Sequence, residues 1–397
     1  MIFLKKIYWL LKAFLANLVY GFPSRGLVII GVTGTDGKTS TTTMIAQMLS
    51  NLGKNVAYVS TVGAKIGGKD YDLGFHVTTP RFFQMQKLLR EAKKAKAQYV
   101  VLEVTSHSID QMRIAGIHFN IAVLTNITNE HLDYHKHFDT YAKTKLKLIN
   151  SADVAIVNRE VNTFYKYKDF IKSKNLWTTA LTKKADIQYA ELVKKGIDDK
   201  FVGFERENLL LAFGVGKVLG FTAADMVKAL NLFQRVIGRF DLIEKKNRRI
   251  MVDFAHTPNA FIMLYKALEE QVQVSRIIHV FGCAGLRDRY KRTEMGEIAG
   301  QHADIVIITE EDYRTEKLAD IFMEIEKGVL KAKRLEKDKS YFFVENRQQA
   351  INMALKLATK EDLVLLTGKA HEKSLARGKK EYPWDEYKAV ETALKTI

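Results

Sequence analysis

The residues best suited to chemistry form a glycine-rich segment between an apolar stretch and a helical pattern. Residues 27–32 are apolar, and residues 39–52 have helical spacing. Glycines let backbone N–H groups approach phosphate oxygens, and a helix N-terminus favours negative charge. A lysine adds positive charge and a threonine hydroxyl suits Mg²⁺, although Val32 replaces the first glycine of the full phosphate-loop pattern. The predicted ATP-binding residues here are Gly34, Thr35, Asp36, Gly37, Lys38, Thr39 and Ser40.

Two further polar groups follow apolar stretches. Glu103 lies at the end of the stretch 99–104, and His131 belongs to the polar run 125–135. In open α/β sheets, ligands bind in the crevice beyond the carboxyl ends of the strands. Taken alone, Glu103 is by default a surface glutamate and His131 a structural histidine. The density of polar groups in the run 125–135 favours a loop that faces a ligand.

Apolar stretches alternate with helical patterns along most of the chain. This alternation predicts parallel sheets and an α/β fold. It stops at a helical pair, residues 207–219 and 223–232, and a second alternation begins at the stretch 250–254 and has its final strand at 363–366. We therefore expect an apolar helix in residues 1–26, a central ATP-binding domain in 27–237 and a C-terminal α/β domain in 238–397.

Composition limits the class of protein. The 397 residues are 47% hydrophobic, and the formal net charge is +17. Such a field attracts anions, but the basic residues are scattered and no aromatic-interleaved basic module stands out, so nucleic-acid binding is not expected. The single cysteine, Cys283, excludes an internal disulfide and fits a reducing cytoplasm.

The N-terminal segment, residues 2–20, is mostly apolar but contains three lysines. The apolar run within it, residues 7–20, is interrupted and shorter than the ~20 predominantly apolar residues that a membrane-spanning helix needs. Two interpretations stay open: a helix packed on the protein core, or an interfacial helix that gives peripheral membrane contact. The residues that could form its apolar surface and basic flank are Ile2, Phe3, Ile7, Trp9, Leu10, Phe14 and Leu18, with Lys5, Lys6 and Lys12.

Seven ordered segments together resemble the Mur ligase family, and most closely the MurE type, the UDP-N-acetylmuramoyl-tripeptide synthetases. The resemblance covers nearly everything from residue 27 onward. It implies a central domain of phosphate-loop ATPase type with a parallel sheet, followed by a Rossmann-like α/β domain. It also implies ATP-dependent amide-bond formation, in which an acidic peptide is activated as an acyl phosphate and joined to an amino acid. The segments are residues 34–39, 103–113, 125–145, 238–240, 252–258, 281–289 and 368–372.

The resemblance also implies roles for individual residues. Lys38 would hold the ATP phosphates, and Lys145, carbamylated in the family, would help to hold Mg²⁺. The implied catalytic residues are Lys38, Glu103, His131 and Lys145, and the implied metal ligands are Thr39, Glu103, His131 and Lys145. Around the nucleotide the family also implies Asn208, Arg239 and Asp253. The implied donor-binding residues are Thr78, Thr79, Thr105, Gln111 and Arg113, and those for the incoming amino acid are Arg287, Asp312, Arg314, Gly368 and Glu372.

Departures from the family pattern concern both substrates. Asp36 replaces the usual Asn of the phosphate loop, and residues 310–314 read EEDYR where diaminopimelate enzymes have DDNPR. Diaminopimelate therefore leads over a basic amino acid only modestly. About 26 residues precede the first predicted strand, so we expect no counterpart of the UDP-binding domain of the MurE type.

Three alternatives stay open. A ligase like folylpolyglutamate synthase also lacks the UDP domain, but its phosphate loop usually reads GKGS. A MurT-like ligase acting on a non-UDP substrate usually has a four-cysteine zinc insertion, which one cysteine cannot build. A non-enzymatic nucleotide-binding scaffold would be expected to lose Lys38, Glu103 or His131, and all three are present.

Overall fold

The computed structural model describes residues 2–74, 77–128 and 132–397. The chain divides into two compact units, of which the first ends at Gln234 and the second spans Arg235–Ile397. The boundary predicted from the sequence, between residues 237 and 238, lies slightly beyond this division. His131 lies outside the described residues.

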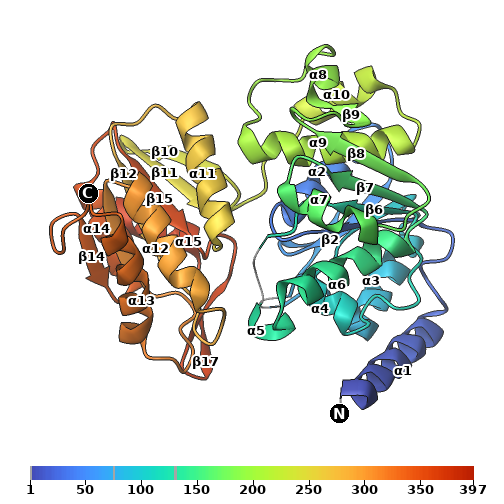
Figure 1. Ribbon diagram of the computed structural model, residues 1–397, viewed down its shortest axis with the longest axis horizontal. Coiled ribbons are helices and arrows are strands. Elements are labelled where there is room, and N and C mark those ends of the chain that lie inside the picture. Colours follow the sequence, from blue (N-terminus) through green and yellow to red (C-terminus); the bar gives the residue numbers. More distant parts are fainter. Residues whose placement is uncertain (1, 75–76, 129–131) are drawn as a thin grey trace. The chain divides into compact units, whose positions relative to one another are not determined.

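The first unit is built on one sheet with the strand order β4-β3-β2-β5-β1-β6-β7-β8-β9 (Figure 1). The central strands β2, β5, β1, β6 and β7 are mutually parallel, whereas β3 and β4 form an antiparallel extension. The strands are β1 (Val28–Thr33), β2 (Val56–Ser60), β3 (Gly63–Ile66), β4 (Lys69–Tyr71), β5 (Tyr99–Glu103), β6 (Ile121–Leu124), β7 (Val154–Asn158), β8 (Leu176–Ala180) and β9 (Ile187–Gln188).

Helices cover both faces of this sheet. The helices α2, α9 and α10 pack together on one face, while α3 and α6 bury their apolar sides in a core cluster on the other. Buried strands such as β1 are apolar nearly throughout because both of their faces are covered. The helices are α1 (Ile2–Tyr20), α2 (Lys38–Asn51), α3 (Phe82–Lys94), α4 (Ser106–Asp110), α5 (Leu132–His135), α6 (Phe138–Ser151), α7 (Asn162–Tyr167), α8 (Tyr189–Val193), α9 (Gly203–Val218) and α10 (Ala223–Asn231).

The N-terminal helix α1 packs against α3 (Figure 1). Ala13 and Ala16 form a small buried cluster with Phe82, and Trp9 is partly buried against it. The Asn17 side-chain amide donates hydrogen bonds to the carbonyl oxygens of Ala13 and Ala115, at 2.8 and 3.0 Å. Among the described residues, no helix is both long and apolar enough to cross a membrane.

The second unit contains a sheet with the order β10-β11-β15-β12-β13-β14, which is parallel except for β10. The helices α14 and α15 bury a core cluster against one face of this sheet. The elements are β10 (Asp241–Lys245), β11 (Arg248–Asp253), α11 (Pro258–Gln271), β12 (Ile277–Phe281), α12 (Tyr290–His302), β13 (Ile305–Thr309), α13 (Leu318–Lys331), β14 (Tyr341–Val344), α14 (Arg347–Leu357), β15 (Leu363–Thr367), β16 (Ser374–Arg377), β17 (Lys380–Pro383) and α15 (Glu386–Leu394).

The mixed α/β class with parallel sheets is confirmed, but residues 363–366 are not the final strand. The hairpin of β16 and β17 follows it. The sequence KEYP of β17 is exposed at every position and lacks the apolar alternation of a half-buried strand. The other strand, β16, is largely buried, but its sequence SLAR places two apolar residues side by side instead of alternating apolar with polar residues. Neither strand of the hairpin therefore gives a periodic signal in the sequence.

A fully buried ion pair joins two elements of the second unit. Arg347, at the start of α14, and Glu386, at the start of α15, are both 0% exposed, with Nη2 and Oε1 2.5 Å apart. The Trp384 indole nitrogen donates to the same carboxylate at 2.7 Å. Burial alone lowers the pKa of Arg347, but the adjacent carboxylates outweigh it and the pKa is raised.

We expect Glu386→Gln to lower the free energy of unfolding by about 3–5 kcal/mol, because it leaves a buried guanidinium without its counter-charge. The matched control is Glu391→Gln, since Glu391 pairs with Lys245 at the surface, where both side chains are about half exposed. The control should cost about 0–1 kcal/mol. Urea unfolding of the two variants measures the difference, and equal losses would refute a special role for the buried pair.

Candidate active site

The phosphate loop joins β1 to α2, as the glycine-rich segment predicts. Gly37 begins α2 with a positive φ of 79°, a conformation that favours glycine. At Gly34 an added Cβ would lie 1.8 Å from the Thr125 Oγ1 atom, so only glycine fits. Lys38 Nζ donates to the Thr35 carbonyl oxygen at 2.6 Å, which holds its ammonium against the loop. The first backbone N–H groups of α2 lack partners within the helix and can bind an anion.

The polar segment after β6 supports this loop. The Asn126 side-chain oxygen accepts a hydrogen bond from the Asp36 N–H at 2.9 Å, and Thr125 Oγ1 donates to the Asp36 carbonyl oxygen at 2.6 Å. Thr35 Oγ1 lies 3.0 Å from the Tyr141 hydroxyl and accepts from the Thr128 N–H at 2.9 Å. This part of the run 125–135 therefore fixes the conformation of the phosphate loop.

Two buried residues from distant helices also reach the loop. Lys145 of α6 is 1% exposed, and its Nζ atom lies 2.5 Å from the Gly34 carbonyl oxygen. Asn208 of α9 is 4% exposed, and its Oδ1 atom accepts a hydrogen bond from Thr41 Oγ1 at 3.1 Å. The buried Nδ2 group of Asn208 has no hydrogen-bond partner among the described residues, so it can donate to a ligand.

Glu103, at the end of β5, is the common hydrogen-bond acceptor for the polar side chains beside the loop. Its carboxylate is 1% exposed and accepts hydrogen bonds from Thr39 Oγ1 at 3.0 Å and from both the N–H and the hydroxyl of Thr61 at 2.9 Å. Carboxylate and hydroxyl oxygens are the hard ligands that Mg²⁺ prefers, and Mg²⁺ usually takes only one or two carboxylates beside phosphates and water. The donor set of Glu103 and Thr39 therefore fits Mg²⁺ beside bound phosphates.

The five predicted donor-binding residues surround the same strand end. Thr79 Oγ1 donates to the Glu103 carbonyl oxygen at 2.9 Å and accepts from the Thr105 N–H at 3.1 Å. Arg113 Nη1 donates to the Thr79 carbonyl oxygen at 2.9 Å, and its Nε and Nη2 atoms donate to Gln111 Oε1 at 3.0 and 2.7 Å. Thr78 Oγ1 lies 3.0 Å from Thr61 Oγ1. The structure thus brings these residues together.

Positively charged side chains lie close together in this cluster. Burial lowers the pKa of Arg113, and the nearby charge of Arg81 lowers it further. Arg81 is exposed and precedes α3, whose first turn contains no acidic residue. Two guanidinium groups and a helix N-terminus therefore create a field suited to an anionic donor.

Tyr134 and His135, in the part of the polar run after His131, contact this cluster. The Tyr134 hydroxyl donates to Asp110 Oδ2 at 2.8 Å, and His135 Nε2 lies 3.0 Å from Ser106 Oγ. Sequence reasoning did not assign a role to Thr61, Asn126 or Tyr134. The position of Asn126 two residues after the buried strand β6 was the available signal for that residue.

The predicted amino-acid residues lie in the second unit, where Lys369 changes the expected charges. This lysine is fully buried, and its Nζ atom lies 2.8 Å from Asp312 Oδ1 and 2.5 Å from Glu372 Oε2. Burial lowers the pKa of Lys369, but the two acids outweigh it and the pKa is raised. Both acids that the sequence offers to a substrate ammonium are thus already paired with a protein cation.

Arg314 and Arg287 have different environments. Arg314 has a positive φ of 52°, and its Nη1 donates to the carbonyl oxygens of Gly285 and Asp312 at 2.9 and 3.1 Å. Its Nη2 is 3.7 Å from Asp312 Oδ2, and no pair with the adjacent glutamates is found among the described residues. Arg287 is exposed and makes no hydrogen bond or ion pair within that same part of the chain.

The remaining predicted residues of the second unit are buried or strained. At Gly368, with φ of 97°, an added Cβ would meet the Glu311 carboxylate at 2.9 Å. Asp253 accepts hydrogen bonds from the N–H groups of Phe240 and Ala255 at 2.7 Å, and burial raises its pKa. The Arg239 guanidinium stacks over the Phe254 ring at 4.6 Å.

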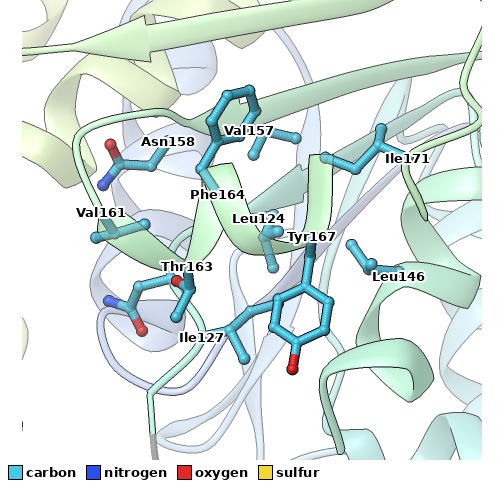
Figure 2. A pocket seen from close by; sticks show the side chains of 11 residues that line it. Leu124, Ile127, Leu146, Val157, Asn158, Val161, Thr163, Phe164, Tyr167 and Ile171 are labelled. Carbon is cyan, nitrogen blue, oxygen red and sulfur yellow. The ribbon is translucent and has the colours of Figure 1, made fainter. Parts of the chain in front are cut away.

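A small hollow lies beside the loop-supporting segment, between β7 and α7 (Figure 2). Its walls are mostly apolar, with Leu124, Val157 and Phe164 among them, and its interior has room for about one water molecule. Such a volume excludes a nucleotide or peptide. The hollow is therefore too small to be a substrate site.

A phosphate loop, a carboxylate suited to Mg²⁺ and a cluster with two arginines at one sheet edge are the features expected of a nucleotide-dependent enzyme. Comparison with known proteins gives the family. The sequence model for the Mur ligase middle domain matches residues 32–215, and that for the Mur ligase glutamate ligase domain matches residues 238–370.

Several curated relatives are UDP-N-acetylmuramoyl-L-alanyl-D-glutamate–2,6-diaminopimelate ligases. The relative from Fusobacterium nucleatum is 32% identical over 94% of this chain and 78% of its own length. The relative from Pseudomonas aeruginosa is 34% identical over 96% and 80%. The chain therefore belongs to the Mur ligase family and is an ATP-dependent ligase that forms amide bonds. Its cofactors are ATP and Mg²⁺.

Solved structures agree with this assignment. A structure of a UDP-N-acetylmuramoyl-L-alanyl-D-glutamate–2,6-diaminopimelate ligase is 29% identical, with a TM-score of 0.59, over 94% of this chain and 79% of its own. The folylpolyglutamate synthase of Mycobacterium tuberculosis, complexed with ADP and AMPPCP, has a TM-score of 0.69 over 90% and 92%. Its identity of 17% shows a shared fold only.

Thr61 provides a test of the Glu103 cluster. We expect Thr61→Val to lower kcat for ADP release roughly tenfold and to raise the Mg²⁺ concentration required, because a charge-assisted hydrogen bond to Glu103 is lost. Thr61→Ser keeps the hydroxyl and should retain most activity. Steady-state kinetics over a Mg²⁺ titration compares them, and an unchanged Thr61→Val variant would contradict a role for this hydroxyl.

Proposed function

We propose that this ligase joins an amino acid to the carboxylate of an acidic peptide, in the synthesis of peptidoglycan or a related peptide. The observation that carries the proposal is the meeting of the phosphate loop, Glu103 and Arg113 at one sheet edge. Glu103 is linked to Thr39 of the loop at 3.0 Å and, through Thr79, to Arg113. A γ-phosphate and a peptide carboxylate bound to these groups would be neighbours.

The chemistry follows from the electrophile. A carboxylate is unreactive toward an amine because oxide is a poor leaving group, whereas an acyl phosphate loses phosphate readily. In this proposal Lys38 and the N-terminus of α2 stabilise charge on the transferring phosphoryl group. Arg113 and Gln111 hold the donor in line with it. Bound Mg²⁺ would offset the phosphate charge, with Thr39 and Glu103 as its protein ligands.

Lys145 is proposed to help hold a second Mg²⁺ as a carbamate, together with His131. Its burial near the Gly34 carbonyl supports a role at the loop rather than at the surface. The ammonium, which repels Mg²⁺, would first lose a proton. The neutral amine would then add to CO₂ through a new N–C bond and release a second proton, which leaves a carbamate anion.

Lys145→Ala should therefore lose most of its ADP-release activity, on the order of 100-fold. Acetate, as a small carboxylate, should restore part of the lost rate in this variant but not in Lys38→Ala. Kinetics with and without acetate measure the effect. Full activity of Lys145→Ala without acetate would eliminate the proposed carbamate.

Diaminopimelate is the amino acid that we propose, with a basic amino acid as the second candidate. The pairing of Asp312 and Glu372 with Lys369 leaves less free negative charge for a side-chain ammonium. The guanidinium groups of Arg314 and Arg287 are suited to a carboxylate. Diaminopimelate has two carboxylates, whereas lysine has only its α-carboxylate. The relatives named above are diaminopimelate ligases.

The decisive experiment measures ADP release with diaminopimelate, lysine, ornithine, alanine and glutamate, each combined with UDP-linked, lipid-linked and free acidic dipeptide donors. A reduced folate with glutamate tests the folylpolyglutamate alternative. We expect diaminopimelate to react fastest, and Arg314→Ala to lower its kcat/KM about 100-fold while changing that of lysine little.

Lys38→Ala serves as the inactive control and should lower ADP release at least about 100-fold at saturating Mg²⁺. Equal rates with alanine and diaminopimelate would overturn the proposed amino-acid pocket. Release that depends on folate would replace the acidic-peptide proposal. Near wild-type release by Lys38→Ala would show that the phosphate-loop role is wrong.

The substrates favour a cytoplasmic location, since ATP is supplied there. Peripheral membrane contact through α1 is a further part of this proposal, and no partner nucleic acid is invoked. The donor could be bound through its peptide and through Arg81 and Arg113 whether its other end is UDP or lipid.

A further inference from the structure

The outward face of α1 is apolar along its entire described length. From Leu4 onward, where the side chains of this helix are described, nine large side chains are at least 40% exposed, among them Leu11 at 63%, Phe14 at 59% and Leu18 at 56%. Monomeric proteins rarely leave a contiguous apolar surface of this kind uncovered. The complete set is Leu4, Ile7, Tyr8, Leu10, Leu11, Phe14, Leu15, Leu18 and Val19.

Helical geometry separates this surface from the packed side. At 3.6 residues per turn the nine residues occupy about half of the circumference, and Trp9, Ala13 and Ala16 lie opposite, where they meet Phe82. Lys5 and Lys12, seven positions apart, fall on one border between the two sides, and Lys6 falls on the other. The lysines therefore flank the apolar surface on both borders.

We propose that α1 docks on an anionic membrane surface, with its nine outward side chains in the bilayer interface and its lysines at the lipid phosphates. A helix with an apolar face bordered by cations matches an interfacial helix, whose lysine heads reach the headgroups. The helix contains no Asp or Glu, and the chain has a net charge of +17. Anionic lipid therefore complements it in charge as well as in polarity.

A second copy of the chain fits this surface less well. Pairing two α1 helices through their outward faces would bring lysine borders toward lysine borders, with no acidic residue in either helix to neutralise them. The unfavourable charge contacts would oppose the apolar contact. The same lysines are favourable against lipid phosphates.

Docking would also orient the active site, and this part rests on the proposed function. The inner side of α1 contacts Phe82 and Ala115, which follow the donor-binding residues Thr79 and Arg113 closely in the chain. The helix thus rests on the two segments that carry the donor cluster. A docked enzyme would hold that cluster near the membrane, where a donor carried on a lipid is concentrated.

The test is co-sedimentation of the full chain with vesicles of phosphatidylcholine alone or mixed with phosphatidylglycerol. We expect the full chain to bind the anionic vesicles. Binding should be at least about tenfold weaker for the triple variant Leu11→Gln, Phe14→Gln and Leu18→Gln. The matched control is Leu232→Gln, because Leu232 is 65% exposed but lies directly after α10, away from α1 in the chain. Changing Lys5, Lys6 and Lys12 to Gln should weaken binding roughly 100-fold at low salt.

Three results would overturn the proposal: no sedimentation of the full chain, equal binding of the triple variant, or a dimer in solution that the triple variant dissociates without vesicle binding. Thermal unfolding of the variants checks that each is folded. ADP release with a water-soluble donor separates the two proposals. If the triple variant keeps its activity but no longer binds vesicles, the outward face of α1 serves docking and not catalysis. If the parent chain itself shows no activity, only the ligase proposal is contradicted.

Discussion

The pairing of β5 with both β1 and β2 is the constraint on which the site depends. In the parallel register Val32 lies opposite Glu103, and Val59 lies opposite Leu102. All three strands therefore end together at one edge of the sheet. The phosphate loop after β1, Thr61 after β2 and the Glu103 carboxylate meet there because parallel strands share the direction of their carboxyl ends.

A buried carboxylate at this edge is tolerated because its oxygens are hydrogen-bonded. Burying a charge without a partner costs on the order of several kcal/mol, whereas hydrogen bonds from hydroxyl and backbone donors stabilise the ionised form. Thr39 and Thr61 supply those donors from two other elements. The same carboxylate oxygens are of the kind that Mg²⁺ prefers, so the hydrogen bonds that permit this burial are compatible with the proposed Mg²⁺ site.

The two units handle charge differently. In the first unit, Arg113 and Arg81 repel one another, which suits an anion supplied from outside. In the second unit, acids and cations are largely matched within the protein, as at Lys369 with Asp312. The apolar outward face of α1 is a third case. No other part of the described chain covers it.

Sequence by itself determined the fold class, the phosphate loop and the ordered segments of the family. Periodicity identified most buried strands and helices, because burial leaves an apolar pattern, and the motif residues are close in the chain. It did not find the hairpin of β16 and β17, because β17 is exposed and β16, although largely buried, shows no alternation of apolar and polar residues in its sequence SLAR.

Only the tertiary structure decided which distant residues meet. The contact of Thr61 with Glu103, the approach of Asn208 to the loop and the capture of Asp312 by Lys369 each join residues more than 40 positions apart. The division of α1 into a packed side and an exposed apolar side likewise depended on Phe82 and Ala115. An apolar helix has the same sequence whether one side or all sides are covered, and only its neighbours distinguish the two.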